Sequence, residues 1–264
     1  MAKVRLDKAL VERGMAPSRE RAQSLILAGR VLVDEQKQTK AGFAIAEDST
    51  IRILGEDMPY VSRGGLKLKG ALDHWTIDLT GRLGVDIGAS TGGFTDCMLQ
   101  RGAIAVLAAD TGYGQLAMKL RNDERVKLLE RTNARLLEPG ALLKEVASLS
   151  TEVAPSFFCM DVSFISASLV VGPVVASLAL PETQWVGECV VLVKPQFEAG
   201  REWVGKGGIV RDPQAYVIAQ DRVKAAIAEA GGVTVEVIDS PITGMEGNRE
   251  FLLYARFGGL PDAS

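Results

Sequence analysis

The chain has 264 residues, of which 47% are hydrophobic and 24% are charged, and its formal net charge is −3. This composition excludes a disordered or fibrous chain and provides enough apolar residues for one large domain with a small companion. Three widely spaced cysteines and a single histidine argue against a disulfide framework or a structural zinc site, so we expect reduced thiols and no metal.

Residues 1–60 are predicted to form a small domain and its linker. The first residues lack the apolar run of an export signal, so we expect the chain in the cytoplasm. Residues 5–14 and 17–30 have apolar residues at helical spacing and contain glycines where a helix would end. Short strands are expected over residues 31–35 and 49–54.

Charge is divided unevenly along the chain. Residues 1–70 carry a net charge of +4 and the remainder −7, which indicates a small basic module that binds a polyanion, attached to an acidic body. Basic side chains along the two predicted helices are suited to phosphate oxygens, and such contacts do not depend on base sequence. The predicted RNA-binding residues are Arg5, Lys8, Arg19, Arg21 and Arg30.

Residues 61–264 alternate between expected strands and helices, including helices over 94–102 and 213–231. This alternation predicts a doubly wound α/β domain with a seven-stranded sheet, whose ligands bind at the carboxyl ends of the strands. The apolar segment 162–181 contains Gly172, Pro173 and four serines, which favours a helix packed on the sheet over a membrane span. The expected strands are 83–88, 103–110, 126–130, 156–161, 189–194, 233–239 and 251–257.

A glycine-rich turn lies in the segment 84–99, after the first strand of this domain. Its spacing matches neither the dinucleotide pattern G-x-G-x-x-G nor the phosphate loop. Asp86 ends the first strand, and Asp110 ends the second, where a carboxylate can accept hydrogen bonds from both ribose hydroxyls. A cofactor with a ribose and an amino-acid end but no phosphate fits this pattern. We therefore expect S-adenosylmethionine rather than NAD or ATP.

Three more charged residues stand at strand ends. Asp161 is followed by Val-Ser-Phe, whereas base-N-methylating enzymes typically have Pro-Pro-aromatic there. Lys194 closes an apolar strand, where an ammonium group needs a polar site or a carboxylate partner. Glu250 opens the last strand. These positions predict that the chemistry lies at one edge of the sheet.

Two resemblances cover nearly the whole chain. "RLDKALVERG", "SRERAQSLILAGRVLVD" and "IRIL" resemble the small RNA-binding domain of ribosomal small-subunit protein four. "YVSRGGLKL", "DIGASTGGFTDCML", "AADTGYGQL", "ERTNAR", "DVSFIS", "LVKPQFE" and "GNREF" resemble ribosomal-RNA ribose 2′-O-methyltransferases related to FtsJ. Together they are similar to the TlyA group, sometimes labelled hemolysin A. This implies a ribosomal RNA or ribosomal subunit as partner, and a cytidine target, which we expect in the large subunit.

The resemblance also implies site residues, beginning with a catalytic tetrad at Lys67, Asp161, Lys194 and Glu250. A neutral lysine can take the proton of a ribose hydroxyl, so we assign Lys194 as the base, oriented by Asp161. Lys67 is then the second cation, and Glu250 fixes Lys67 or the substrate hydroxyl. The predicted cofactor contacts are Asp86, Gly88, Ala89, Ser90, Thr91, Gly92, Gly93, Phe94, Asp110 and Asn133.

Other functions stay open from the residues alone. Cys159 would be the nucleophile of a cytosine base methyltransferase, although its apolar neighbours indicate a buried, inert thiol. The hemolysin label implies a membrane-lytic protein, but no basic amphipathic helix is evident, so we expect no membrane partner. Tyr113 either packs on adenine or is a turn residue, and the loop 206–212 either contacts RNA phosphates or is simply flexible.

Overall fold

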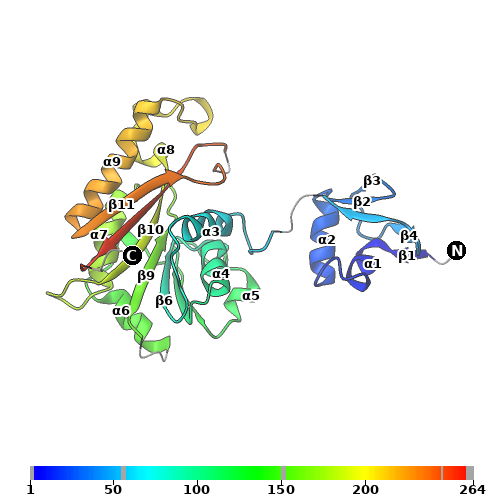
Figure 1. The fold of residues 1–264 in the computed structure, drawn as a ribbon, viewed down its shortest axis with the longest axis horizontal. Coiled ribbons are helices and arrows are strands. Elements are labelled where there is room, and N and C mark those ends of the chain that lie inside the picture. Colours follow the sequence, from blue (N-terminus) through cyan, green and yellow to red (C-terminus); the bar gives the residue numbers. More distant parts are fainter. Residues whose placement is uncertain (1–2, 55–57, 150–152, 245, 260–264) are drawn as a thin grey trace. The chain divides into compact units, whose positions relative to one another are not determined.

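A computed structural model of the protein describes residues 3–54, 58–149, 153–244 and 246–259. The chain divides into two compact units, Met1–Asp57 and Met58–Ser264, three residues before the boundary expected from the sequence. Residues 55–57 of the expected linker lie outside the described residues. Each unit has its own apolar core and is described by itself (Figure 1).

The N-terminal unit packs two helices, α1 (Leu6–Glu12) and α2 (Arg19–Leu27), against short strands. Ser18 caps α2 by accepting a hydrogen bond from the backbone N–H of Arg21 at 3.2 Å. Strands β3, β2 and β5 form one antiparallel sheet, and β1 pairs with β4. The strands are β1 (Lys3–Arg5), β2 (Val31–Val33), β3 (Gln36–Gln38), β4 (Ala44–Ala46) and β5 (Ile51–Ile53).

A buried carboxylate links the first helices of this unit. Oδ2 of Asp7 accepts hydrogen bonds from Arg5 Nη2, Arg19 Nε and Gln23 Nε2, each at 3.0 Å. The Arg5 guanidinium beside Asp7 holds the pKa of this carboxyl well below its usual range. Two of the predicted RNA-binding arginines therefore also have a structural partner inside the fold.

The other predicted RNA-binding residues have different surroundings. Lys8 forms an exposed ion pair with Glu12 at 3.3 Å. Arg30 donates from Nε to the carbonyl oxygen of Leu54 at 2.8 Å. Arg21 lies in the first turn of α2, and its side chain is partly exposed. Their RNA contacts stay a prediction.

The second unit is built on a seven-stranded sheet in the order β11-β12-β10-β9-β6-β7-β8. All pairs from β10 to β8 are parallel, and β12 is antiparallel to both of its neighbours. The predicted doubly wound, seven-stranded α/β sheet is therefore confirmed. The strands are β6 (Leu83–Ile87), β7 (Ala105–Ala109), β8 (Val126–Leu129), β9 (Pro155–Met160), β10 (Gly187–Val193), β11 (Gly232–Asp239) and β12 (Phe251–Phe257).

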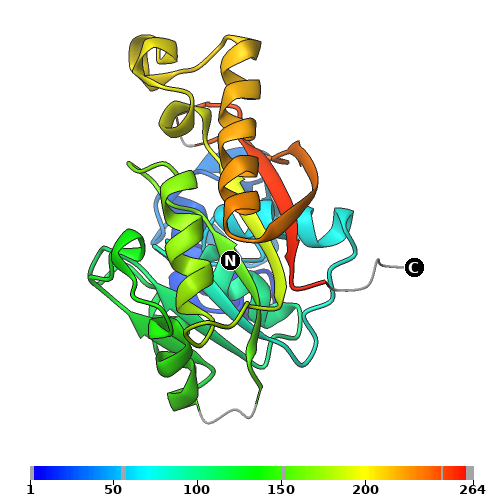
Figure 2. The ribbon, with the colours of Figure 1, turned by 90° about the vertical axis from the view of Figure 1, so that its left-hand side faces the viewer.

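Helices cover both faces of this sheet (Figures 1 and 2). Alternate strand residues point to opposite faces, so Val85 and Phe158 pack with α6, α7 and α9, whereas Val106 and Phe157 pack with α3, α4 and α5. The helices are α3 (Gly64–His74), α4 (Gly93–Gln100), α5 (Met118–Arg121), α6 (Ala141–Val146), α7 (Ser168–Ser177), α8 (Pro195–Glu198) and α9 (Pro213–Glu229). Short 3₁₀ turns are Ala134–Leu136, Ala147–Leu149, Arg201–Trp203 and Lys206–Gly208.

The uncharged segment 162–181 contains α7. Val170, Val171 and Val174 of this helix are buried in the core on one face of the sheet. Throughout the described ranges, no helix combines the length and apolar character needed to cross a membrane. The prediction of a helix packed on the sheet is confirmed.

We expect Asp7→Ala to destabilise the N-terminal unit by about 1–3 kcal/mol, because it removes a buried carboxylate that accepts four hydrogen bonds. The matched control Glu12→Ala removes an exposed ion pair on the same helix and should cost less than about 1 kcal/mol. Hydrogen exchange of the full chain is the measurement. Exchange should accelerate over residues 3–54 in Asp7→Ala only, and stay unchanged over residues 58–259 in both variants.

The Asp7 carboxylate also predicts that the N-terminal unit loses stability at low pH. Because the folded-state pKa of Asp7 lies below its unfolded value of about 3.9, the stabilisation is complete above that value and is lost progressively as the pH falls from there through the folded-state pKa. After correction for intrinsic rates, exchange over residues 3–54 should rise below about pH 4 in the unmodified chain. It should rise much less in Asp7→Ala. Equal rises in both proteins would contradict the assignment.

Candidate active site

Two adjoining cavities open at the carboxyl ends of the central strands. The chain runs from β6 to β7 and β8 on one side, then crosses to β9 and β10 on the other, so the cavities lie at the switch point of the sheet. The smaller has a volume of about 280 Å³ and the larger about 680 Å³. The residues common to both are Gly88, Ser90, Asp161, Ser163 and Phe164.

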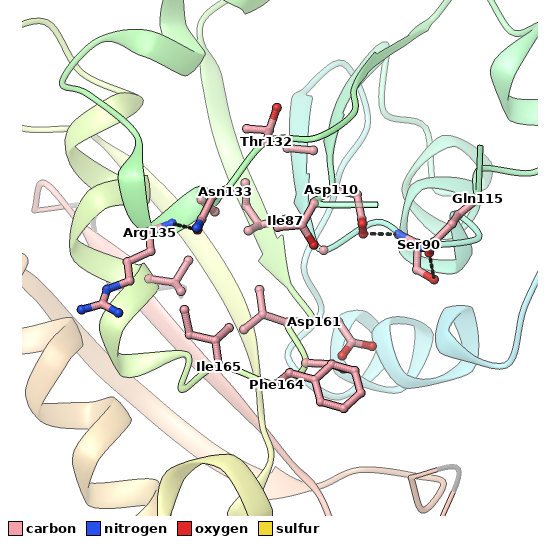
Figure 3. Close-up of a pocket in the computed structure, with 17 residues that line it drawn as sticks. Ile87, Ser90, Asp110, Gln115, Thr132, Asn133, Arg135, Asp161, Phe164 and Ile165 are labelled. Atoms are coloured by element: carbon pink, nitrogen blue, oxygen red, sulfur yellow. Dashed lines mark hydrogen bonds between the residues drawn. The ribbon is translucent and has the colours of Figure 1, made fainter. Parts of the chain in front are cut away.

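The smaller cavity is lined by four of the predicted cofactor residues, Gly88, Ser90, Asp110 and Asn133 (Figure 3). The carboxylate of Asp110 accepts hydrogen bonds from the backbone N–H of Ser90 at 2.8 Å and of Gly112 at 2.6 Å. Asn133 Oδ1 accepts from the backbone N–H of Arg135 at 3.1 Å. Further lining residues, which we did not predict although they lie in or beside the quoted motifs, are Thr111, Gln115, Thr132 and Arg135.

Glycines are required in the turn after β6 because the backbone of this turn lies very close to other segments. Gly88 has φ +83°, and a Cβ there would lie 2.5 Å from the carbonyl oxygen of Asp161. A Cβ at Gly93 would lie 2.2 Å from Ser62 Oγ. These glycines let the end of β6 meet the end of β9 and the segment before α3. Of the predicted cofactor residues, Gly88, Ala89, Ser90, Thr91, Gly93 and Phe94 line the larger cavity.

Asp86 and Gly92, also predicted as cofactor contacts, line neither cavity. Asp86 is fully buried, and its Oδ2 accepts hydrogen bonds from the backbone N–H and the hydroxyl of Thr95 at 2.9 and 2.6 Å. Burial raises the pKa of Asp86 to about 7. Asp86 thus supports the first turn of α4 from below. Gly92 has φ +96°, and a Cβ there would overlap the side chains of Leu116 and Leu120.

The four predicted catalytic residues come together in the wall of the larger cavity, as two ion pairs. Lys67 Nζ lies 2.5 Å from Glu250 Oε2, and Lys194 Nζ lies 2.6 Å from Asp161 Oδ1. Lys194 also donates to Ser163 Oγ at 2.7 Å. Both lysines are only 8% exposed. Two buried ammonium groups each have a carboxylate partner, as their burial requires.

Asp161 is held from two directions. Its Oδ1 is buried and lies 2.6 Å from Lys194 Nζ. The backbone N–H of Asp161 donates to Ile87 O at 2.9 Å. These contacts fix the residue at the boundary between the two cavities.

Asn248 holds one wall of the larger cavity, and sequence analysis missed it, although it lies in the motif "GNREF". Its Nδ2 donates to Gly208 O at 2.9 Å, and its Oδ1 accepts from the backbone N–H of Val210 at 3.0 Å. The Asn248 side chain is buried two residues before Glu250. The glycine-rich loop 206–212 is thereby tied to the catalytic strand, which argues against the interpretation of a simply flexible loop.

An aromatic pair lies at the cavity mouth. Phe164 is 93% exposed, has φ +63° and lines both cavities. Its ring centroid is 5.7 Å from that of Phe197. A large apolar ring held in the open by a strained backbone indicates a binding role. In Figure 3 this ring lies beside Asp161.

Two further residues considered from the sequence lie outside the cavities. Cys159 is fully buried in β9 and its Sγ donates to Val85 O at 3.6 Å; burial raises the pKa of this thiol far above its usual value. Tyr113 lines neither cavity, and Arg131 packs over its ring at 4.7 Å, as a turn residue would. Over the described part of the chain, no group of three or more His, Cys, Asp or Glu could hold a metal ion.

Comparisons with known proteins match both units. A family model described as FtsJ-like methyltransferase matches residues 60–257, and one described as S4 domain matches residues 4–51. The protein of Mycobacterium tuberculosis H37Rv named 16S/23S rRNA (cytidine-2′-O)-methyltransferase TlyA is 42% identical, over 96% of this chain and 90% of its own. Hemolysin A of Brachyspira hyodysenteriae is 38% identical, over 95% of this chain and 99% of its own.

A solved structure agrees with the fold. A protein of Streptococcus thermophilus, provisionally described as a hemolysin, has a TM-score of 0.70 and 40% sequence identity to this chain. The match covers 99% of this chain and 90% of the other. The predicted resemblances of both units are confirmed.

We expect Gly88→Ala to weaken binding of S-adenosylmethionine at least about tenfold, because the new methyl group would push the turn away from Asp161. Gly81→Ala is the matched control, since Gly81 also has positive φ, +72°, but nothing lies within 4 Å of its Cβ position. It should lose about 1 kcal/mol of stability and keep its cofactor affinity. Isothermal titration calorimetry measures both; equal losses of affinity would contradict this role for Gly88.

Proposed function

Because the chain belongs to the family of FtsJ-like methyltransferases, we propose that it transfers a methyl group from S-adenosylmethionine to the 2′-hydroxyl of a cytidine in ribosomal RNA. The observation that carries this proposal is the pair of buried Lys–carboxylate contacts in one cavity wall. The M. tuberculosis relative is named for this reaction. We place the target in large-subunit RNA, one of the two RNAs in that name, and the protein in the cytoplasm.

The described residues fit the cofactor. Asp110 offers carboxylate lone pairs to ribose hydroxyls, and Asn133 lines the same cavity. The bare backbone of Gly88 suits the polar amino-acid end. When bound, S-adenosylmethionine supplies a methyl group activated by its sulfonium. The protein's remaining tasks are to align the acceptor hydroxyl and remove its proton.

The tetrad is arranged for proton removal. In this proposal the Lys194 ammonium first loses a proton to solvent, and the resulting amine accepts the proton of the 2′-hydroxyl, while Asp161 and Ser163 hold its Nζ in the cavity wall. Glu250 holds Lys67 on the α3 side, so a cation stands where the hydroxyl oxygen gains negative charge. Both lysines are placed before the substrate arrives, which reduces the reorganisation needed in the transition state.

RNA is bound by both units in this proposal. The S4 unit supplies phosphate contacts through its five predicted basic residues, which raise affinity without reading sequence. In the methyltransferase unit, the exposed Phe164 offers a face on which the target base stacks, near the tetrad.

One other function is weakened by a specific observation, and a second is open to a direct test. Cys159 is fully buried and absent from both cavity walls, so it has no access to a cytosine ring. The hemolysin names of relatives bring a lytic activity into consideration. Release of dye from liposomes by the purified protein, without S-adenosylmethionine, would support that function instead.

We expect Lys194→Ala to lower methyl transfer by at least about a hundredfold, because the hydroxyl loses its base, while binding of S-adenosylmethionine is retained. Cys159→Ser is the control for base methylation and should keep ribose methylation near normal. The assay is transfer of labelled methyl groups to purified large and small ribosomal subunits, with 2′-O-methyl sites mapped by resistance to alkaline hydrolysis. Near-normal transfer by Lys194→Ala would rule out its role as the base.

We expect Phe164→Ala to lower kcat/KM for the ribosomal subunit by about five- to a hundredfold, because a stacking face is lost. Phe164→Trp should retain activity, since indole also stacks. Val233→Ala shortens another exposed apolar side chain, on β11, and should change little. Loss of activity in Phe164→Trp equal to that in Phe164→Ala would argue against stacking.

A further inference from the structure

Glu198 is a buried carboxylate that has no role in the mechanism above. It is the last residue of α8, four positions after Lys194, and it is only 1% exposed. Its carboxylate accepts hydrogen bonds from the hydroxyl of Ser166 and from the backbone N–H of Ala167, each at 2.5 Å. Burial raises the pKa of Glu198, and the hydrogen bonds offset part of the cost of burying its charge. These contacts therefore fix where the segment before α7 lies relative to α8.

Glu198 also caps α7 from another element of the fold. Ala167 is the N-cap residue of α7 and has no side-chain oxygen, so the first N–H groups of this helix need an acceptor from elsewhere. The Glu198 carboxylate meets the N–H of Ala167 at the end of the helix that favours negative charge. The end of the segment 161–167 is thus defined by a tertiary contact.

The segment 161–167 is then held at both ends. At its start, the backbone N–H of Asp161 donates to Ile87 O at 2.9 Å. Between the two ends lies Phe164, whose φ of +63° is strained and persists only where surrounding contacts determine it. Because Asp161 has its own contact with the end of β6, removal of the Glu198 carboxylate releases mainly the part of the segment that carries Phe164.

The position of Glu198 relative to the proposed proton acceptor is fixed as well. The backbone N–H of Glu198 donates to Lys194 O at 3.2 Å, within the single turn of α8. The carbonyl oxygen of Glu198 accepts a hydrogen bond from Nη1 of Arg222, which lies in α9. Since α9 packs in the core, α8 offers the segment 161–167 a fixed support beside Lys194.

We propose that Glu198 is a positioning residue, which holds the segment 161–167 against α8 so that the ring of Phe164 is presented to the target base. The proposal rests on the function proposed above, because Glu198 acts through the stacking of a base on this ring. A ring that is placed in advance costs less to order when RNA binds. Removal of the carboxylate therefore raises KM for the ribosomal subunit, whereas kcat changes much less because Lys194 keeps its partner Asp161.

The experiment measures kcat and KM for the ribosomal subunit that the unmodified enzyme methylates, and calorimetric binding of S-adenosylmethionine, for each variant. Glu198→Ala removes the carboxylate. Glu198→Gln keeps the shape and one carbonyl acceptor, and the Ser166 hydroxyl can accept from its amide group. Val174→Ala loosens the packing of α7 in the core and is the matched control for a merely structural effect.

We expect Glu198→Ala to raise KM by about five- to twentyfold, to change kcat by less than about threefold and to keep its affinity for S-adenosylmethionine. Glu198→Gln should restore KM to within about threefold of the unmodified enzyme. In the double variant of Glu198→Ala with Phe164→Ala, kcat/KM should equal that of Phe164→Ala alone, because the carboxylate acts through the ring. Ser166→Ala removes only one of the hydrogen bonds and should raise KM by a smaller factor.

An unchanged KM in Glu198→Ala would overturn the proposal, and so would an unchanged KM in Ser166→Ala if Glu198→Ala does not fold. An equal rise of KM in Val174→Ala would reduce the effect to general loosening of α7. Losses that multiply in the double variant would show that Glu198 does not act through Phe164. Absence of ribose methylation by the unmodified enzyme would overturn the proposed function itself, and the two failures are thereby distinguished.

Discussion

The pairing of two buried lysines with two carboxylates is the constraint on which the site depends. An ammonium group taken out of water is costly unless an opposite charge meets it, and removing one partner leaves the other uncompensated. Lys67 comes from α3, Glu250 from the start of β12, and Lys194 and Asp161 from the ends of β10 and β9. These four elements must be correctly placed together, so the requirement that shapes the reaction site also selects one arrangement of helix and sheet.

A second constraint is the close approach of β6 and β9. Gly88 allows the turn to lie against the carbonyl oxygen of Asp161, and the Asp161 N–H returns a hydrogen bond to Ile87. Asp86 then holds the first turn of α4 through Thr95, beneath the cavity floor. The absence of a phosphate-loop pattern follows from this use, because the turn brings bare backbone to a ligand without a phosphate. The glycines serve contact between strand ends as much as contact with a ligand.

Much of this arrangement was predictable, because short apolar strands that alternate with helices and end in charged residues indicate both the sheet and its reactive edge. The resemblance supplied the tetrad, which strand ends alone indicated only as separate charges. Asp86 shows the limit: a carboxylate at a strand end looks alike in sequence whether it faces the ligand or supports the turn from below. Asn248 was missed because its significance comes from tertiary contacts, through which it clamps the loop 206–212.

Asp161 connects the smaller cavity with the larger one, because it contacts residues of both. It lines both cavities, its carbonyl abuts the cofactor turn, and its carboxylate meets Lys194. A displacement of the glycine-rich turn would therefore move Asp161, and Asp161 in turn contacts Lys194, the proposed proton acceptor. On the other side, Lys194 leads directly into α8, and Glu198 ties that helix back to the segment after Asp161. The cofactor turn and the proposed proton acceptor are thus joined by connected contacts, which favours a fixed alignment of the two groups.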